Sequence, residues 1–131
     1  MNSFVAKVKH IQNRDNLNIV NFTFGDSTLS MMSLGLTSKL QVGSVVKLTV
    51  KATHITIAKE FSGLISDANI LQAKIVAVDN GELLSSVKLL LQGIEIESII
   101  TSEVSQKMNL QKDDDVTIFI SPSELSIVSI F

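Results

Sequence analysis

The sequence predicts an all-β protein made of two tandem five-stranded β-barrels, with at most one short helix in each. Three observations lead to this prediction: an internal repeat of about half the chain length, an alternation of apolar and polar residues with a period of two, and a single convincing helical segment. Because the repeat covers nearly all of the 131 residues, it determines the architecture before any single residue does.

The repeat is visible as matching segments. Ala6-Lys7-Val8 returns as Ala73-Lys74-Ile75, Leu40-Gln41 returns as Leu110-Gln111, and Val50-Lys51-Ala52-Thr53 returns as Ile120-Ser121-Pro122-Ser123. Between the first two segments, Asn13 matches Asn80, Leu17 matches Leu84, Val20 matches Val87, Phe22 matches Leu89 and Phe24 matches Leu91. The difference in residue number between matching residues is constant until Leu34 and then grows by three. This indicates one short insertion in a loop or helix of the second copy.

The repeat divides the chain into a first barrel at 1–60, a linker and opening segment at 61–69, and a second barrel at 70–131. Gly63 lies in the linker, where it is free to adopt unusual backbone angles. Units of roughly 60 residues bury only about 60% of their unfolded surface, so each copy needs a neighbour. A hydrophobic content of 45% and a mean hydropathy of +0.36 agree with this, and we expect a homo-oligomer.

Alternation with a period of two predicts the strands, because successive side chains of a strand point to opposite faces. In the first copy the alternating apolar positions are Phe4, Ala6 and Val8, then Val20, Phe22 and Phe24, then Val46, Leu48 and Val50, then Ile55 and Ile57. In the second copy the predicted strands are 71–78, 86–91, 94–100, 116–120 and 125–130. We expect these strands to be half-buried.

The one convincing helix is predicted at residues 102–108. Thr101 or Ser102 can cap its first turn, and Glu103 suits its positive end. The counterpart near residues 37–38 is expected to be shortened. Five short antiparallel strands with a helix before the fourth are typical of a small closed barrel of the oligonucleotide/oligosaccharide-binding (OB) type.

Composition excludes several classes of protein. Eleven basic and thirteen acidic residues give a net charge of −2, and without a basic block, Tyr or Trp we expect no direct nucleic-acid partner. No stretch reaches the ~18 apolar residues of a membrane helix, and the start lacks a signal-peptide pattern, so we expect a cytoplasmic protein away from the membrane. Without an activated nucleophile, a paired acid and base or a metal-ligand cluster, we expect neither an enzyme nor a bound cofactor or metal.

Four short motifs at strand and helix ends point to a known family. The family has four motifs in order along the chain: Ser-Ala-Arg-Asn before the first strand, Ile-Thr at the end of the third strand, a Leu-Gly-Leu-like exit from the helix, and a Lys-Ala-Ser/Thr turn before the last strand. The corresponding segments here are Ser66-Asp67-Ala68-Asn69, Ile100-Thr101, Met108-Asn109-Leu110 and Lys51-Ala52-Thr53. In these motifs the chain resembles the molbindin, or molybdenum-pterin-binding (Mop, TOBE-like), family, including the paired effector domains of molybdate-responsive regulators. The resemblance implies that the protein binds molybdate or tungstate for intracellular storage, buffering or sensing.

The resemblance also implies the residues of the oxyanion site. They are Lys51, Ala52, Thr53, Ser66, Asn69, Thr101 and Ser123. A tetrahedral dianion, deprotonated at pH 7, offers only hydrogen-bond acceptors, so its surroundings must consist of donors. Lys51 can supply a charge-assisted bond, while Thr53 and the nearby backbone amides supply others.

The chain departs from the family pattern in two places. In the opening motif Ala68 stands where the family has arginine, and Asp67 places a carboxylate beside it. In the second copy Ser121 stands where the first has lysine, and Pro122 lacks the backbone N–H that Ala52 keeps. We therefore expect a composite site, in which the turn at 51–53 of one copy faces the segment at 66–69 or Thr101 of another copy, within the chain or in a second subunit.

Simpler interpretations stand beside these. Lys51 can be a solvated lysine at a strand end, and Thr101 is more simply a helix cap than a ligand. We expect 113–115, which is Asp-Asp-Asp, to be a solvated turn, and His10 and His54 to be structural. An alternative for the whole chain is an oligomerisation or effector module of a regulator or transporter that has kept the fold and lost the ligand.

Overall fold

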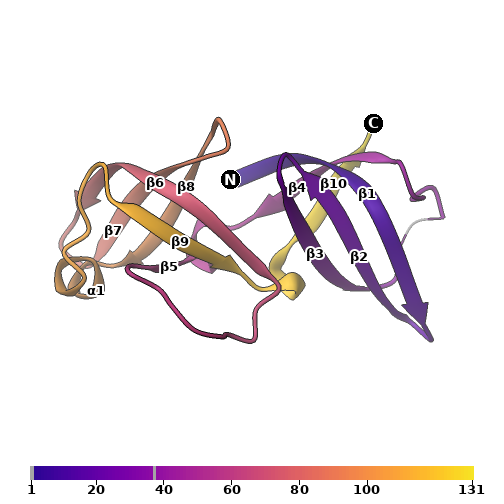
Figure 1. The fold of residues 1–131 in the computed structure, drawn as a ribbon, viewed down its shortest axis with the longest axis horizontal. Helices are drawn as coiled ribbons and strands as arrows, with labels where there is room; N and C mark the ends of the chain where they lie inside the picture. Colours follow the sequence, from indigo (N-terminus) through magenta and orange to yellow (C-terminus); the bar gives the residue numbers. More distant parts are fainter. Residues whose placement is uncertain (1, 37) are drawn as a thin grey trace.

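The computed structural model describes residues 2–36 and 38–131, and it contains two five-stranded antiparallel sheets (Figure 1). The first sheet, in the order β10-β4-β1-β2-β3, consists of β1 (Asn2–Arg14), β2 (Leu17–Phe24), β3 (Ser27–Leu34), β4 (Val45–Val50) and β10 (Ser126–Ile130). The second, in the order β5-β9-β6-β7-β8, consists of β5 (Thr56–Ala58), β6 (Asn69–Asn80), β7 (Leu84–Leu91), β8 (Ile94–Thr101) and β9 (Asp115–Ile120). Three short helices complete the fold: η1 (Ala52–His54), α1 (Ser102–Lys107) and η2 (Pro122–Glu124).

The burial of side chains follows the predicted period of two. Every second residue is buried at the start of β1, and the matching strand β6 of the second copy begins with the same pattern. The all-β prediction, with almost no helix, is therefore confirmed. The sheets are curled (Figure 1), and the closure of each into a complete barrel stays a prediction.

The last strand of each repeat lies in the sheet of the other repeat. Strand β5 of the first copy pairs with β9, where Ile57 is opposite Ile118. Strand β10 of the second copy pairs with β4, where Ile127 is opposite Leu48. The predicted division into 1–60 and 70–131 follows the repeats of the sequence, and the backbone hydrogen bonds cross this division in both directions. Each sheet thus takes four strands from one repeat and its fifth from the other.

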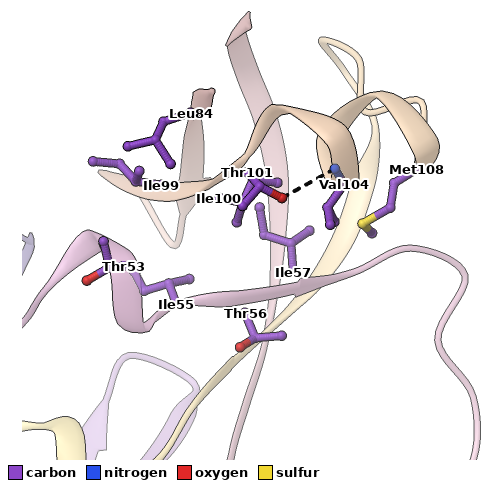
Figure 2. A pocket seen from close by; sticks show the side chains of 10 residues that line it. All are labelled: Thr53, Ile55, Thr56, Ile57, Leu84, Ile99, Ile100, Thr101, Val104 and Met108. Carbon is purple, nitrogen blue, oxygen red and sulfur yellow. Dashed lines mark hydrogen bonds between the residues drawn. The ribbon is translucent and has the colours of Figure 1, made fainter. Parts of the chain in front are cut away.

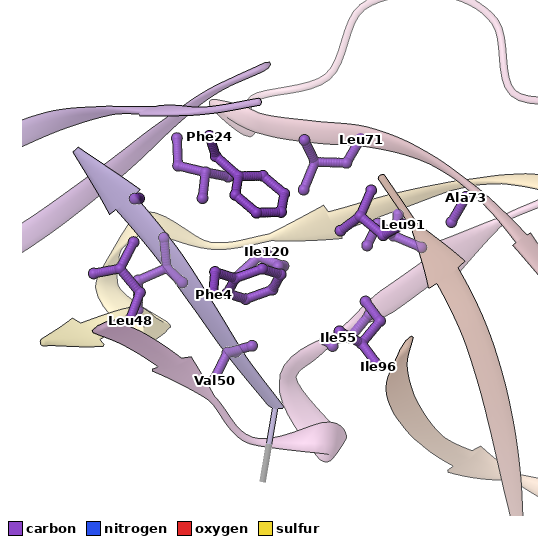
Figure 3. Close-up of a cluster of buried hydrophobic side chains, with 14 of the residues drawn as sticks. Phe4, Phe24, Leu48, Val50, Ile55, Leu71, Ala73, Leu91, Ile96 and Ile120 are labelled. Atoms are coloured by element: carbon purple, nitrogen blue, oxygen red, sulfur yellow. The ribbon is translucent and has the colours of Figure 1, made fainter. Parts of the chain in front are cut away.

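One hydrophobic core runs through both sheets as a consequence of this exchange. Figure 3 shows side chains of the first repeat, such as Phe4 and Val50, beside side chains of the second, such as Leu91 and Ile120. Phe4 also packs edge to face against Phe24, with ring centroids 5.3 Å apart. Because these side chains are almost completely buried, neither repeat keeps its core without the other.

Two asparagines in equivalent positions join the repeats by the same contact. The Asn2 side chain donates to the carbonyl of Glu97 (2.7 Å) and accepts from its N–H (2.7 Å). The Asn69 side chain does the same to Ser30, with 2.9 Å to the carbonyl and 2.7 Å from the N–H, and it also donates to the carbonyl of Ile120 (2.8 Å). Each amide therefore pairs with the middle of a strand of the other repeat.

The predicted helix is present as α1, which ends at Lys107. Thr101 is its N-cap, and the Thr101 hydroxyl accepts from the N–H of Val104 (3.4 Å). Ser102, the other candidate for the cap, is buried and donates to the carbonyl of Gly81 (2.8 Å). In the first copy residue 38 lies in a turn, and Thr37 is outside the described residues. No helix of the described part of the chain is long and apolar enough to cross a membrane.

The linker between β5 and β6 is fastened to the second repeat at its start. The Lys59 ammonium donates to the carbonyl of Asn109 (2.8 Å) and pairs with the Asp114 carboxylate (3.1 Å). The N–H of Gln111 donates to the same carboxylate (2.9 Å). The hydrogen bond from Gln111 is the main reason why the pKa of Asp114 lies below its ordinary value, and the Lys59 ammonium lowers this pKa further. Further along the linker, Gly63 has a φ of +100°, as its predicted freedom requires.

We expect Asn69→Asp to lower the free energy of unfolding by about 3 kcal/mol, because a carboxylate cannot donate to the carbonyls of Ser30 and Ile120 in a site without solvent. Asn13→Asp, at an exposed asparagine of β1, should cost less than about 1 kcal/mol. Urea unfolding of the two variants measures both values. Similar losses of unfolding free energy for the two variants would contradict a stabilising role for the Asn69 contact between the repeats.

The lowered pKa of Asp114 predicts a contribution to stability that is present at neutral pH. This contribution is lost as the pH falls below about 4, because the unfolded carboxylate takes up its proton at a higher pH than the folded one. Melting temperatures measured from pH 6 to pH 3 should fall less steeply for Asp114→Asn than for the wild type. Asp115→Asn, which removes an exposed ion pair with Lys74, is the control and should leave the slope unchanged.

Candidate oxyanion site

The two short turns that precede the last strands, η1 and η2, have the same geometry. The residues before them, Lys51 and Ser121, are both extended, with φ of −70° and −60°. Each turn is closed by one backbone bond of 2.9 Å, from His54 to Lys51 and from Glu124 to Ser121. The His54 Nδ1 atom lies 2.8 Å from a carboxylate oxygen of Glu124. The strand exchange therefore brings the corresponding turns of the two repeats into contact.

The two turns offer different numbers of backbone donors. The first two N–H groups of such a turn have no partner inside it, and in η1 these belong to Ala52 and Thr53. In η2 the first position is Pro122, so Ser123 supplies the one remaining N–H. The asymmetry expected from the sequence thus exists between two turns of similar shape, and η1 has one more free backbone donor than η2.

Where the turns meet there is a pocket of about 290 Å³, which we call the twin-turn pocket. It is lined by Thr49, Val50, Lys51, His54, Ser123, Glu124 and Ser126. Two predicted site residues from different repeats, Lys51 and Ser123, are brought together here. Within residues 2–36 and 38–131 the Lys51 ammonium has no ion-pair partner. The pocket therefore holds a lysine without a direct ion-pair partner among hydroxyl groups, next to the His54–Glu124 pair.

A second pocket, of about 360 Å³, contains two other predicted site residues. It is lined by Thr53, Ile55, Thr56, Ile57, Leu84, Ile99, Ile100, Thr101, Val104 and Met108. Figure 2 shows Thr53 on the first repeat and Thr101 on the second, with the dashed bond from Thr101 to Val104 that caps α1. The lining carries three hydroxyls and no charged side chain, so within one chain this pocket lacks a cation for a dianion.

The remaining predicted residues lie elsewhere. Ala52 borders a hollow with Asn2 and Glu97, and Ser66 is exposed in the linker and belongs to neither of the two pockets. Asn69 is completely buried, and both N–H bonds of its amide are used by the carbonyls of Ser30 and Ile120. Its side chain has no donor left for an anion in this arrangement.

The carboxylate of Asp67, which would repel an anion, is hydrogen-bonded to the backbone two residues further along the chain. It accepts a hydrogen bond from the N–H of Asn69 (2.9 Å). The side chain is thus held in a local turn at the start of β6. Of the aspartate run at 113–115, Asp113 lies in a turn and Asp115 begins β9, and no group of three metal-ligating side chains occurs among the described residues.

Of the twin-turn pocket, sequence reasoning identified Lys51 and Ser123 and missed the other five residues, among them the two with titratable side chains, His54 and Glu124. The first was expected to be structural, and the second was not considered. They occupy the same position of the repeated turn, three residues after Lys51 and Ser121, and they carry complementary chemistry. That correspondence was a usable signal, but it gains meaning only when the two turns are known to touch.

Comparison with known proteins agrees with this architecture. Residues 65–127 match the TOBE domain family. A crystal structure of the cytoplasmic molybdate-binding protein ModG, with molybdate bound, superposes with a TM-score of 0.90 at 24% sequence identity, over 96% of this chain and 94% of that one. A search of curated protein sequences found no match. Residues 65–127 thus have the sequence pattern of a TOBE domain, and over nearly its whole length the chain has the fold of ModG.

Proposed function

We propose that this protein binds molybdate or tungstate reversibly in the cytoplasm, and that it serves in storage, buffering or sensing of the oxyanion. The observation that carries the proposal is the twin-turn pocket, where the unpaired Lys51 ammonium and the Ser123 hydroxyl of the other repeat border one cavity. The TOBE match and the fold shared with a molybdate-binding protein support it.

The donors at this pocket suit a tetrahedral dianion. Lys51 supplies a charge-assisted bond, which is shorter and about twice as strong as a neutral one. The N–H groups of Ala52 and Thr53 belong to the same turn, although Ala52 lines the hollow beside Asn2 and Thr53 lines the second pocket. A molybdate ion held by Lys51 and hydroxyls would need no metal or cofactor from the protein.

A complete site would draw on a second subunit. Thr101 and Ser66 are separated from Lys51 within one chain, so a neighbouring copy would supply them if they act as ligands. Large apolar side chains are exposed near these groups, with Leu84 59% and Val104 44% exposed beside the threonine pocket. Exposed apolar groups at a pocket rim suit burial against a partner, which agrees with the proposed homo-oligomer.

The competing function is an assembly module that has lost its ligand. Glu124 favours it, because a carboxylate inside the twin-turn pocket opposes a dianion, and Pro122 removes a donor from the second turn. Titration with tungstate separates the two functions, since a folded module would give neither heat nor a raised melting temperature.

Lys51→Ala should weaken tungstate binding about tenfold or more, because it removes the one charge-assisted donor of the pocket. Ser121→Ala, in the matching turn of the other repeat, should change the affinity less than about twofold. Isothermal titration calorimetry measures both constants.

Lys47→Ala is the matched control for charge, since Lys47 lies on β4 four residues before Lys51 and does not line the pocket. All three variants should melt at the temperature of the wild type. Equal losses for Lys51→Ala and Ser121→Ala would contradict a site centred on the first turn.

A further inference from the structure

We propose that His54 and Glu124 set the charge of the twin-turn pocket, so that oxyanion binding is coupled to the uptake of a proton by His54. The inference rests on the proposed function and concerns the same pocket. It assigns an anion-binding role to a histidine that the sequence presents as structural.

The geometry places both groups at the pocket and in contact with each other. His54 Nδ1 lies 2.8 Å from Glu124 Oε2, and the two side chains are 38% and 39% exposed. Both line the pocket together with Lys51. They are therefore accessible to protons from solvent and close enough to act on a bound anion.

The charged groups that face His54 can be named from each element around it. Before η1 there is Lys51, and on η2 there is Glu124, while β4 contributes Thr49 and Val50, and β10 contributes Ser126. Strand β8 also packs against η1, and its Glu95 and Glu97 line the neighbouring hollow beside Ala52 and not this pocket. With a neutral imidazole, the lysine and the glutamate cancel and the pocket has no net charge. With an imidazolium, the pocket carries one net positive charge.

Two effects of protonation act in the same direction. The imidazolium compensates the Glu124 carboxylate, whose charge otherwise opposes the dianion. A neutral imidazole that donates from Nδ1 to Glu124 has an acceptor at Nε2, whereas the imidazolium has a donor there. Histidine in general is the side chain that changes its charge between pH 5 and pH 8, and this sets the pH range of the test.

The test compares molybdate and tungstate binding at pH 6 and pH 8 by calorimetry. The wild type should bind about fivefold more tightly at pH 6, a modest factor because the groups are partly exposed and screened. Glu124→Gln should bind more tightly at pH 8 than the wild type does at pH 8, because the charge of Lys51 is then no longer cancelled. His54→Gln should bind equally at both pH values, at the weaker level.

His10→Gln is the matched control, because His10 is exposed on β1 and does not line the pocket. It should keep the pH profile of the wild type. Linkage adds an independent readout: if protonation favours the anion, then binding must take up protons, which calorimetry in buffers of different ionisation enthalpy measures. The wild type should take up a fraction of a proton at pH 7, and His54→Gln less.

The outcomes separate this inference from the proposed function. If the wild type binds, His54→Gln keeps its pH profile and proton uptake, and Glu124→Gln binds no more tightly than the wild type at pH 8, the inference is overturned and the binding function stands. If the wild type binds neither anion at either pH, the proposed function fails and the inference with it. Either pocket variant is sufficient, so a folding defect in one, seen in its melting curve, leaves the other to decide.

Discussion

The exchange of the last strands is the constraint on which the rest of this structure depends. A sheet of four strands from one repeat would leave β4 or β9 with an open edge, and an open edge exposes unpaired backbone groups. Strands β10 and β5 cover these edges from the other repeat. The shared core and the asparagine contacts of Asn2 and Asn69 reinforce the same arrangement, because each joins a strand of one repeat to the other.

The exchange also explains why the candidate site is composite. The turns η1 and η2 lead into the exchanged strands, so they meet where the two repeats cross. A pocket at this place necessarily combines side chains of both copies, as Lys51 and Ser123 show. Because the copies have diverged, the pocket is not symmetric: one turn has a lysine and two free N–H groups, and the other has Ser121 and Pro122.

The sequence predicted α1 and nine of the ten strands, because a period of two and a cap at Thr101 are local signals, and it gave no strand for β3 in the first copy. It did not predict the partner of the last strands, since alternation specifies which face of a strand is buried and not which strand lies beside it. The same limit affected the site. Asn69 was selected by its motif, but its amide is consumed by Ser30 and Ile120, contacts that no local pattern encodes. His54 and Glu124 became visible only through the contact of the turns.

The linker at residues 59–68, which joins β5 to β6, has a consequence for how the protein responds to dilution. A single repeat with this topology would have to capture its fifth strand from another molecule, so its folding would depend on protein concentration. Joined by ten residues, the two repeats meet at an effective concentration that the tether sets, however scarce the protein is. Because the two copies are joined, the folding of one chain does not depend on protein concentration. Only the assembly of several chains does.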